Sequence, residues 1–229
     1  MGNKHLKSLN TPPTWNVDVK KEVYVTRPNP GAHRFSEGMS AIAFLRDIIG
    51  VAQTRKEINY ILTQGVMLVD GVQRKDRKFI IGLMDTVAFP STKSHHRIIL
   101  NAHGKLNVIP ISEAESKLKV CKITGKNMHH GKVQLTLFDG RTIVGDAQGA
   151  RVGDSLLIEV PGSKVKELLR LEKGSLVLIN GGKHAGAIVR VDALDQDTIT
   201  CSSKEKSFNT AKRYAFVVGK EKPSITLSP

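Results

Sequence analysis

The chain has 229 residues and a formal net charge of +14, from 35 Lys and Arg against 21 Asp and Glu. No stretch approaches the about 18 apolar residues of a membrane-spanning helix, and residues 1–10 lack the apolar core of a secretory signal. Cys121 and Cys201 stand apart, which is typical of a reducing compartment, so we expect a cytoplasmic protein. The positive charge favours a polyanionic partner, but charge alone does not distinguish RNA from DNA or an anionic membrane.

Residues 1–38 are predicted to form a basic N-terminal extension rather than a domain. Pro12, Pro13 and Pro28 interrupt any regular element. We expect the segment to lie along nucleic acid and to be poorly ordered by itself, because it buries too little apolar area to offset the entropy of ordering it. Trp15 could insert into a partner, but we favour packing on the protein's own body. The expected nucleic-acid contacts in this segment are Lys4, His5, Lys7, Lys20 and Lys21.

Residues 39–91 are predicted to form a small domain that contains both helices and strands. Apolar residues recur at helical spacing between Ile42 and Ile49, which predicts a helix over about 39–49. Gly50 follows and is suited to end it. Further strands are expected within residues 79–89.

The stretch that follows Gly50 has the clearest local signals. Thr54 and Glu57 have the spacing of a capping box, and Gly65 is suited to end the helix that they start. Residues 66–69 are a short apolar run rich in valine, which predicts a strand. The Asp-Gly dipeptide at 70–71 then predicts a type I′ hairpin turn, because both positions of that turn need positive φ.

Basic residues gather at both ends of this stretch. Two stand at the helix start, where free amides and the helix dipole attract anions, and four follow the hairpin turn. Each one by itself could be an ordinary solvated charge, but the group favours phosphate binding. The residues predicted to bind nucleic acid here are Arg55, Lys56, Asn59, Gln64, Arg74, Lys75, Arg77 and Lys78.

Residues 92–172 are predicted to form a β-rich central domain. Short apolar segments alternate with glycine-containing turns, which is typical of a compact sheet or barrel. The expected strands are 97–100, 106–109, 118–123, 133–138 and 155–160.

Residues 173–229 are predicted to form a small SH3-like β-barrel. The expected strands are 176–179, 187–191, 198–201 and 215–218. Residues 181–186 form a glycine-rich loop in which Lys183 and His184 are expected to contact phosphate. A nucleotide-binding P-loop is excluded, because Ala187 stands where that motif needs Lys.

No metal site, cofactor or catalytic centre is predicted. The histidine pairs at 95–96 and 129–130 have no cysteine or carboxylate at ligand spacing, so we interpret them as solvated or RNA-facing. The chain contains no GxSxG and no HExxH motif. We therefore expect a protein that is not an enzyme and binds no small-molecule substrate.

Two segments resemble known RNA-associated modules. Residues 45–71 resemble the S-four RNA-binding domain, an α-α-β module, with Asp70 where many members carry Asn; both suit the turn. Residues 174–191 resemble a KOW motif, with Gly186 at its characteristic glycine. Together with the basic N-terminal segment, this order resembles the small-subunit ribosomal proteins of the S-four-e family, and the short C-terminus is closer to the archaeal form.

The resemblance implies an α+β, multidomain protein: an S-four-like α-α-β module, a β-rich central domain and a C-terminal SH3-like KOW barrel. It implies binding to small-subunit ribosomal RNA beside neighbouring ribosomal proteins, without catalysis. One alternative is an RNA-modifying enzyme, because S-four modules also occur beside pseudouridine synthase domains. Another is a KOW-type transcription elongation factor, which would leave the S-four-like module unexplained.

Overall fold

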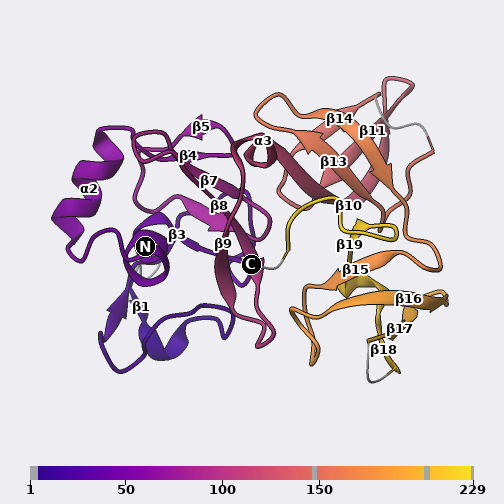
Figure 1. The fold of residues 1–229 in the computed structure, drawn as a ribbon, viewed down its shortest axis with the longest axis horizontal. Helices are drawn as coiled ribbons and strands as arrows, with labels where there is room; N and C mark the ends of the chain where they lie inside the picture. Colours follow the sequence, from indigo (N-terminus) through magenta and orange to yellow (C-terminus); the bar gives the residue numbers. More distant parts are fainter. Residues whose placement is uncertain (1–4, 146–148, 204–206, 228–229) are drawn as a thin grey trace. The chain divides into compact units, whose positions relative to one another are not determined.

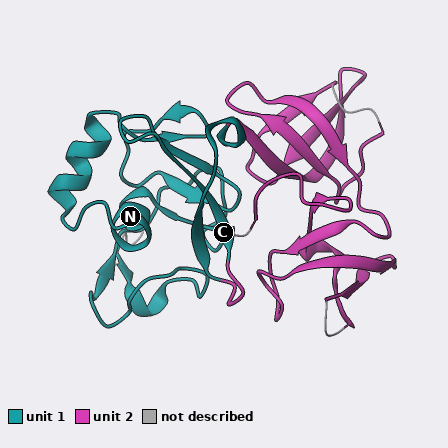
Figure 2. Ribbon diagram, viewed as in Figure 1, with its two compact units in different colours: residues 1–100, 105–116 teal, residues 101–104, 117–229 magenta. Residues whose placement is uncertain are grey.

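A computed structural model describes residues 5–145, 149–203 and 207–227 (Figure 1). The chain divides into two compact units (Figure 2). Unit 1 comprises residues 1–100 with 105–116, and unit 2 comprises residues 101–104 with 117–229. Both units are built mainly from antiparallel strands with few helices, so the chain is a multidomain, β-rich protein.

The main sheet of unit 1 has five strands in the order β5-β4-β7-β8-β9, and every neighbouring pair is antiparallel. The strands are β4 (Leu68–Val69), β5 (Val72–Gln73), β7 (Thr86–Phe89), β8 (Ser94–Leu100) and β9 (Leu106–Pro110). They come from both sides of residue 91, where the sequence predicts a domain boundary. Arg97 in β8 is fully buried, and its Nη1 forms an ion pair with Glu115 on α3 (Glu113–Ser116) at 2.6 Å.

The first helical segment begins two residues later than the predicted residue 39. Met39 and Ser40 belong to β3 (Gly38–Ser40), which pairs with β6 (Ile80–Gly82). Ser40 then caps α1 (Ala41–Ala43) by accepting a hydrogen bond from the amide of Ala43. The segment continues as a π-helix, η2 (Phe44–Ile49), and ends at Gly50, whose φ of 74° confirms the predicted glycine stop.

The N-terminal segment is part of unit 1. Its strands β1 (Leu6–Lys7) and β2 (Tyr24–Val25) pair with each other, and a 3-10 turn, η1 (Ser8–Asn10), follows β1. Trp15 is only 3% exposed and its ring packs against that of Phe35 at a centroid distance of 5.4 Å, which confirms packing on the protein's own body. The described part of the predicted extension therefore contributes to the core.

The first sheet of unit 2 has five antiparallel strands in the order β12-β11-β10-β13-β14. A register shift between Ile123 and Gly125 bends the long strand β10, which pairs with β13 before the bend and with β11 after it. Apolar side chains from these strands, including Leu135 and Ile158, form one core cluster. The strands are β10 (Leu118–His129), β11 (Lys132–Leu137), β12 (Thr142–Val144), β13 (Ser155–Glu159) and β14 (Lys164–Leu169).

The second sheet of unit 2 has the strand order β18-β17-β16-β15-β19. The ammonium group of Lys122 on β10 donates to the carbonyl oxygens of Arg213 (2.7 Å) and Ala215 (2.6 Å), which ties the two sheets of this unit together. A 3-10 turn, η3 (Lys212–Tyr214), precedes β19. The strands are β15 (Leu176–Ile179), β16 (Ile188–Leu194), β17 (Thr198–Ser202), β18 (Ser207–Ala211) and β19 (Ala215–Gly219).

The structure contains a strand at each of the nine apolar segments predicted in residues 92–229. It also contains β12, β14 and β18, which the sequence did not indicate. Each of these three lies at the edge of its sheet. Edge strands are exposed on more sides and need fewer apolar residues, so they lack the hydrophobic signal of the central strands.

Candidate nucleic-acid interface

The second helix of unit 1, α2 (Arg55–Thr63), starts with the predicted capping box. The Thr54 hydroxyl accepts from the amide of Glu57 at 3.3 Å, and the Glu57 carboxylate accepts from the amides of Thr54 and Gln53 at 3.2 and 3.1 Å. These hydrogen bonds hold the pKa of the Glu57 carboxyl below its usual range, and the bond from the Thr54 amide has the largest effect. The Glu57 carboxylate already accepts hydrogen bonds from the amides of Gln53 and Thr54 at this helix start. The binding of an anion here would therefore depend more on the basic side chains than on free amides.

The hairpin after α2 also has its predicted geometry. Gly65, at φ 72°, ends the helix, and Asp70 and Gly71 have φ of 49° and 75°. These two positive values confirm the type I′ turn between β4 and β5. The buried carboxylate of Asp70 accepts from the amide of Thr86 at 3.0 Å, so the turn is fixed to strand β7.

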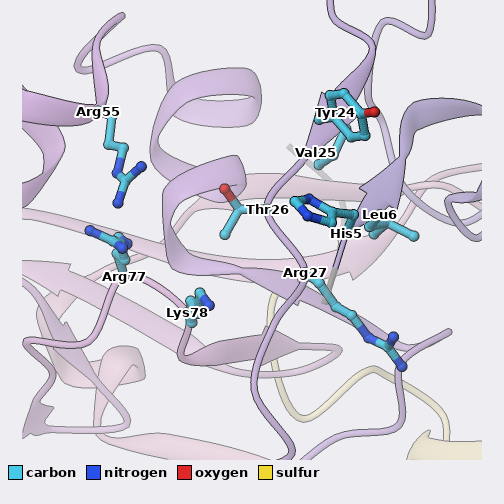
Figure 3. A pocket seen from close by; sticks show the side chains of 9 residues that line it. All are labelled: His5, Leu6, Tyr24, Val25, Thr26, Arg27, Arg55, Arg77 and Lys78. Atoms are coloured by element: carbon cyan, nitrogen blue, oxygen red, sulfur yellow. The ribbon is translucent and has the colours of Figure 1, made fainter. Parts of the chain in front are cut away.

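A cavity of about 300 Å³ lies where this module meets the N-terminal segment (Figure 3). Its walls come from three places in the chain: the β1–β2 pair with the residues that follow it, the start of α2, and the loop between β5 and β6. The lining residues are His5, Leu6, Tyr24, Val25, Thr26, Arg27, Arg55, Arg77 and Lys78.

Three of the predicted RNA-binding residues, Arg55, Arg77 and Lys78, stand together on one wall of this cavity. Figure 3 shows the guanidinium of Arg55 turned toward that of Arg77, with Lys78 beside it. Within the described part of the chain, none of these three side chains forms an ion pair with a carboxylate. Like charges that approach without a neutralising partner form a site for an anion.

The other predicted residues of the N-terminal segment and the module do not line the cavity, apart from His5. The guanidinium of Arg74 lies over the ring of Phe79 at 4.5 Å and is half-buried. Lys4 falls outside the described residues. The remaining positions are exposed or half-buried on the surface of unit 1: Lys7, Lys20, Lys21, Lys56, Asn59, Gln64 and Lys75.

Lys183 and His184 lie in unit 2, on the loop between β15 and β16, and both are exposed. The ring of His184 stacks on that of Phe208 in β18, with centroids 4.0 Å apart and planes 23° apart. Gly186 closes the loop at φ 87°, and a side chain at this position would overlap the carbonyl oxygen of Asn101. The close packing of Gly186 against the backbone of Asn101 therefore holds this loop in place.

Sequence reasoning did not include Tyr24, Thr26 and Arg27 among the site residues, although they line the cavity. The strand that carries Tyr24 has two residues and pairs with another two-residue strand. Such strands are too short for a period of two to be seen in the sequence. The basic charge of Arg27 was the one available signal, and its guanidinium lies 5.7 Å from the ring centre of Phe35.

The described residues contain no group of three or more His, Cys, Asp or Glu side chains arranged to hold a metal ion. Among those same residues, no helix combines the length and the apolar character needed to cross a membrane.

Comparison with known proteins identifies the family. A model described as ribosomal family S4e matches residues 92–165, and a model of the RS4NT domain matches residues 1–36. The small ribosomal subunit protein eS4 of Methanocella arvoryzae is 34% identical, over 98% of this chain and 98% of that protein. The protein of the same name from Korarchaeum cryptofilum is 37% identical, over 99% of this chain and 97% of its own length.

A solved structure has the same fold. The crystal structure of the 30S ribosomal protein S4e from Thermoplasma acidophilum matches with a TM-score of 0.72 at 23% identity, covering 84% of this chain and 99% of that one. The identity to the eS4 proteins extends over nearly their whole length, and the family model covers the end of unit 1 and the start of unit 2. The chain therefore belongs to ribosomal family S4e, which confirms the resemblance to the S-four-e family.

Proposed function

We propose that this chain is a structural, non-enzymatic component of the small ribosomal subunit that binds ribosomal RNA and works in the cytoplasm. Its relatives are named small ribosomal subunit proteins, which supports the assignment. The observation that carries RNA binding is the cavity wall of Arg55, Arg77 and Lys78, whose charges have no carboxylate partner in the described structure. Phosphates are the anions that such a wall would neutralise in a ribosome.

The modules of the chain fit this role. Helix α2 with the β4–β5 hairpin supports an S-four-like module, and the compact sheet β15 to β19 supports a KOW-type SH3-like barrel. We propose the corresponding division into an N-terminal segment (1–38), an S-four-like domain (39–91), a central domain (92–172) and a KOW domain (173–229), in which the main sheet of unit 1 crosses the boundary at residue 91.

Several basic surfaces would share the contact with RNA, because the net charge of +14 is not confined to one module. Unit 1 would contribute the cavity and the exposed residues around it, of which Lys56 and Lys75 are examples. Unit 2 would contribute the loop with Lys183 and His184. Other faces would pack on neighbouring small-subunit proteins.

The test is co-purification with the ribosome. Small subunits are isolated from the native organism, washed in high salt, and probed for this chain by mass spectrometry. We expect the chain in an amount comparable to that of other small-subunit proteins. Its loss from intact, washed subunits would overturn the proposal, whereas retention of the chain only in the free cytoplasmic fraction would point to a role outside the ribosome.

A further inference from the structure

The cavity of unit 1 has two chemically different sides (Figure 3). One side is the cationic wall of Arg55, Arg77 and Lys78. The other side comes from the N-terminal segment and carries the rings of His5 and Tyr24, whose centroids are 5.8 Å apart, as well as Arg27. A site for phosphate alone would need only the first side.

The aromatic side of the cavity is built on the paired strands β1 and β2. Leu6 and Val25 are buried and pair directly with each other in the β1–β2 ladder. Tyr24 is the neighbour of Val25 on the same strand, and its side chain is largely exposed. The ring of Tyr24 is therefore presented to an incoming ligand from a paired strand, and His5 directly precedes the strand that pairs with it.

The shape of the cavity bears on which form of RNA it could accept. A paired A-form helix offers backbone phosphates on a convex surface, and its bases are stacked inside. Such a surface would contact exposed lysines such as Lys56, but it would leave a recess of about 300 Å³ unfilled. A recess of this volume lies at the small end of ligand sites, which are roughly 300–1,000 Å³.

We propose that this cavity receives a single unpaired nucleotide that projects from folded RNA. Its phosphate lies against Arg55, Arg77 and Lys78, and its base lies against the rings of His5 and Tyr24. Cations neutralise the phosphate, and aromatic side chains stack with an unstacked base of any sequence. This inference rests on the proposed RNA-binding function and specifies the RNA feature that the site takes.

The experiment compares two RNA hairpins of equal length and charge. One carries a single bulged 2-aminopurine nucleotide and the other is fully paired. Binding of the full chain is measured at one salt concentration, together with the fluorescence of 2-aminopurine, which falls when the base stacks. We expect the bulged hairpin to bind about 10-fold tighter, within the range of one base–aromatic contact, and its fluorescence to fall on binding.

Four variants locate the effect. Tyr24→Ala should lower the affinity for the bulged hairpin about 10-fold and leave the affinity for the paired hairpin unchanged. Tyr24→Phe keeps the aromatic ring and should keep the preference for the bulged hairpin. Tyr60→Ala is the matched control, because Tyr60 is 67% exposed on α2 and does not line the cavity. Arg77→Ala should weaken binding of the bulged hairpin more than that of the paired one.

The outcomes separate the two proposals. Equal binding of both hairpins, or an equal effect of Tyr24→Ala on both, would overturn the nucleotide site and leave RNA binding in place. If neither hairpin nor ribosomal RNA binds, the proposed function fails and the nucleotide site fails with it. A preference for the bulge that Tyr24→Ala leaves intact would place the unpaired nucleotide elsewhere and also overturn the inference.

Discussion

The imidazole Nε2 of His33 lies 2.9 Å from both carboxylate oxygens of Asp85, and both side chains are buried. The same carboxylate accepts from the amide of Gly82 at 2.9 Å. A side chain at Gly82 would overlap the His33 ring, so the glycine makes room for it. The contact joins the N-terminal segment to the residues that lead into strand β7, and it places that segment within the fold of unit 1.

We expect His33→Ala to lower the free energy of unfolding of unit 1 by about 3 kcal/mol, because it leaves the Asp85 carboxylate buried without this partner. Trp15 is the only tryptophan in the sequence and lies in unit 1, so its fluorescence in a urea titration reports this unit selectively. Arg34→Ala, at an exposed neighbouring position, is the control and should change stability little. Equal losses for the two variants would contradict a specific role for the buried pair.

Gly186→Ala is expected to destabilise unit 2 more than Gly174→Ala does. Both glycines have φ near +90°, at 87° and 88°, so alanine is strained at both by roughly 1–2 kcal/mol. Only at Gly186 would the new methyl group also overlap the carbonyl oxygen of Asn101; at Gly174 it meets open space. This overlap should add about 1–3 kcal/mol, measured by calorimetry. Similar losses at the two positions would show that the loop can move away from Asn101 at little cost.

The stability contributed by Asp139 should depend on pH. Burial by itself raises its pKa, but the charges of Lys119 at 3.1 Å and Arg141 at 3.2 Å outweigh it and hold the pKa below its usual range. A carboxyl group with a lowered folded-state pKa stabilises the fold above its unfolded pKa of about 3.9, and this contribution is lost as the pH falls through the lower folded value.

We therefore expect Asp139→Asn to cost about 3–5 kcal/mol at neutral pH, with the difference from the wild type shrinking below about pH 4. Urea unfolding at a series of pH values measures both effects. Asp197→Asn, at an exposed position in the same unit, serves as the control. A difference that stays constant down to the acid transition would rule out the ionised carboxylate as its source.

The double variant Arg55→Ala/Arg77→Ala should bind ribosomal RNA more weakly and with a shallower salt dependence. Each lost phosphate contact lowers the slope of log K against log salt by about 0.7–0.9. The pair Arg55→Lys/Arg77→Lys retains both charges and should keep the slope close to that of the wild type. The measurement is a set of binding titrations at several salt concentrations. An unchanged slope for the alanine pair would remove this wall from the RNA-binding surface.

Several elements could be predicted because their signals are local. The Thr54–Glu57 capping box, the stops at Gly50 and Gly65 and the turn at Asp70 depend on interactions within a few residues. The central strands were also predicted, because each is a compact run of apolar residues between glycine-containing turns. The edge strands β12, β14 and β18 and the later start of α1 were missed, since sheet pairing rather than local preference determines them. The π-helical form of η2 was also missed.

By itself, the sequence determined the basic character of the chain, the capping of α2, the glycine stops and the hairpin turn, and three of the cationic residues that line the cavity. Only the tertiary structure decided that Arg55, Arg77 and Lys78 share one wall and that Tyr24 and His5 face the same recess. The cavity joins positions about 20 to 70 residues apart, and the β1–β2 pair and the buried contact of His33 with Asp85 hold the N-terminal segment within unit 1. Contacts over such separations leave no periodic signal in a single sequence, because the folded backbone rather than the spacing brings them together.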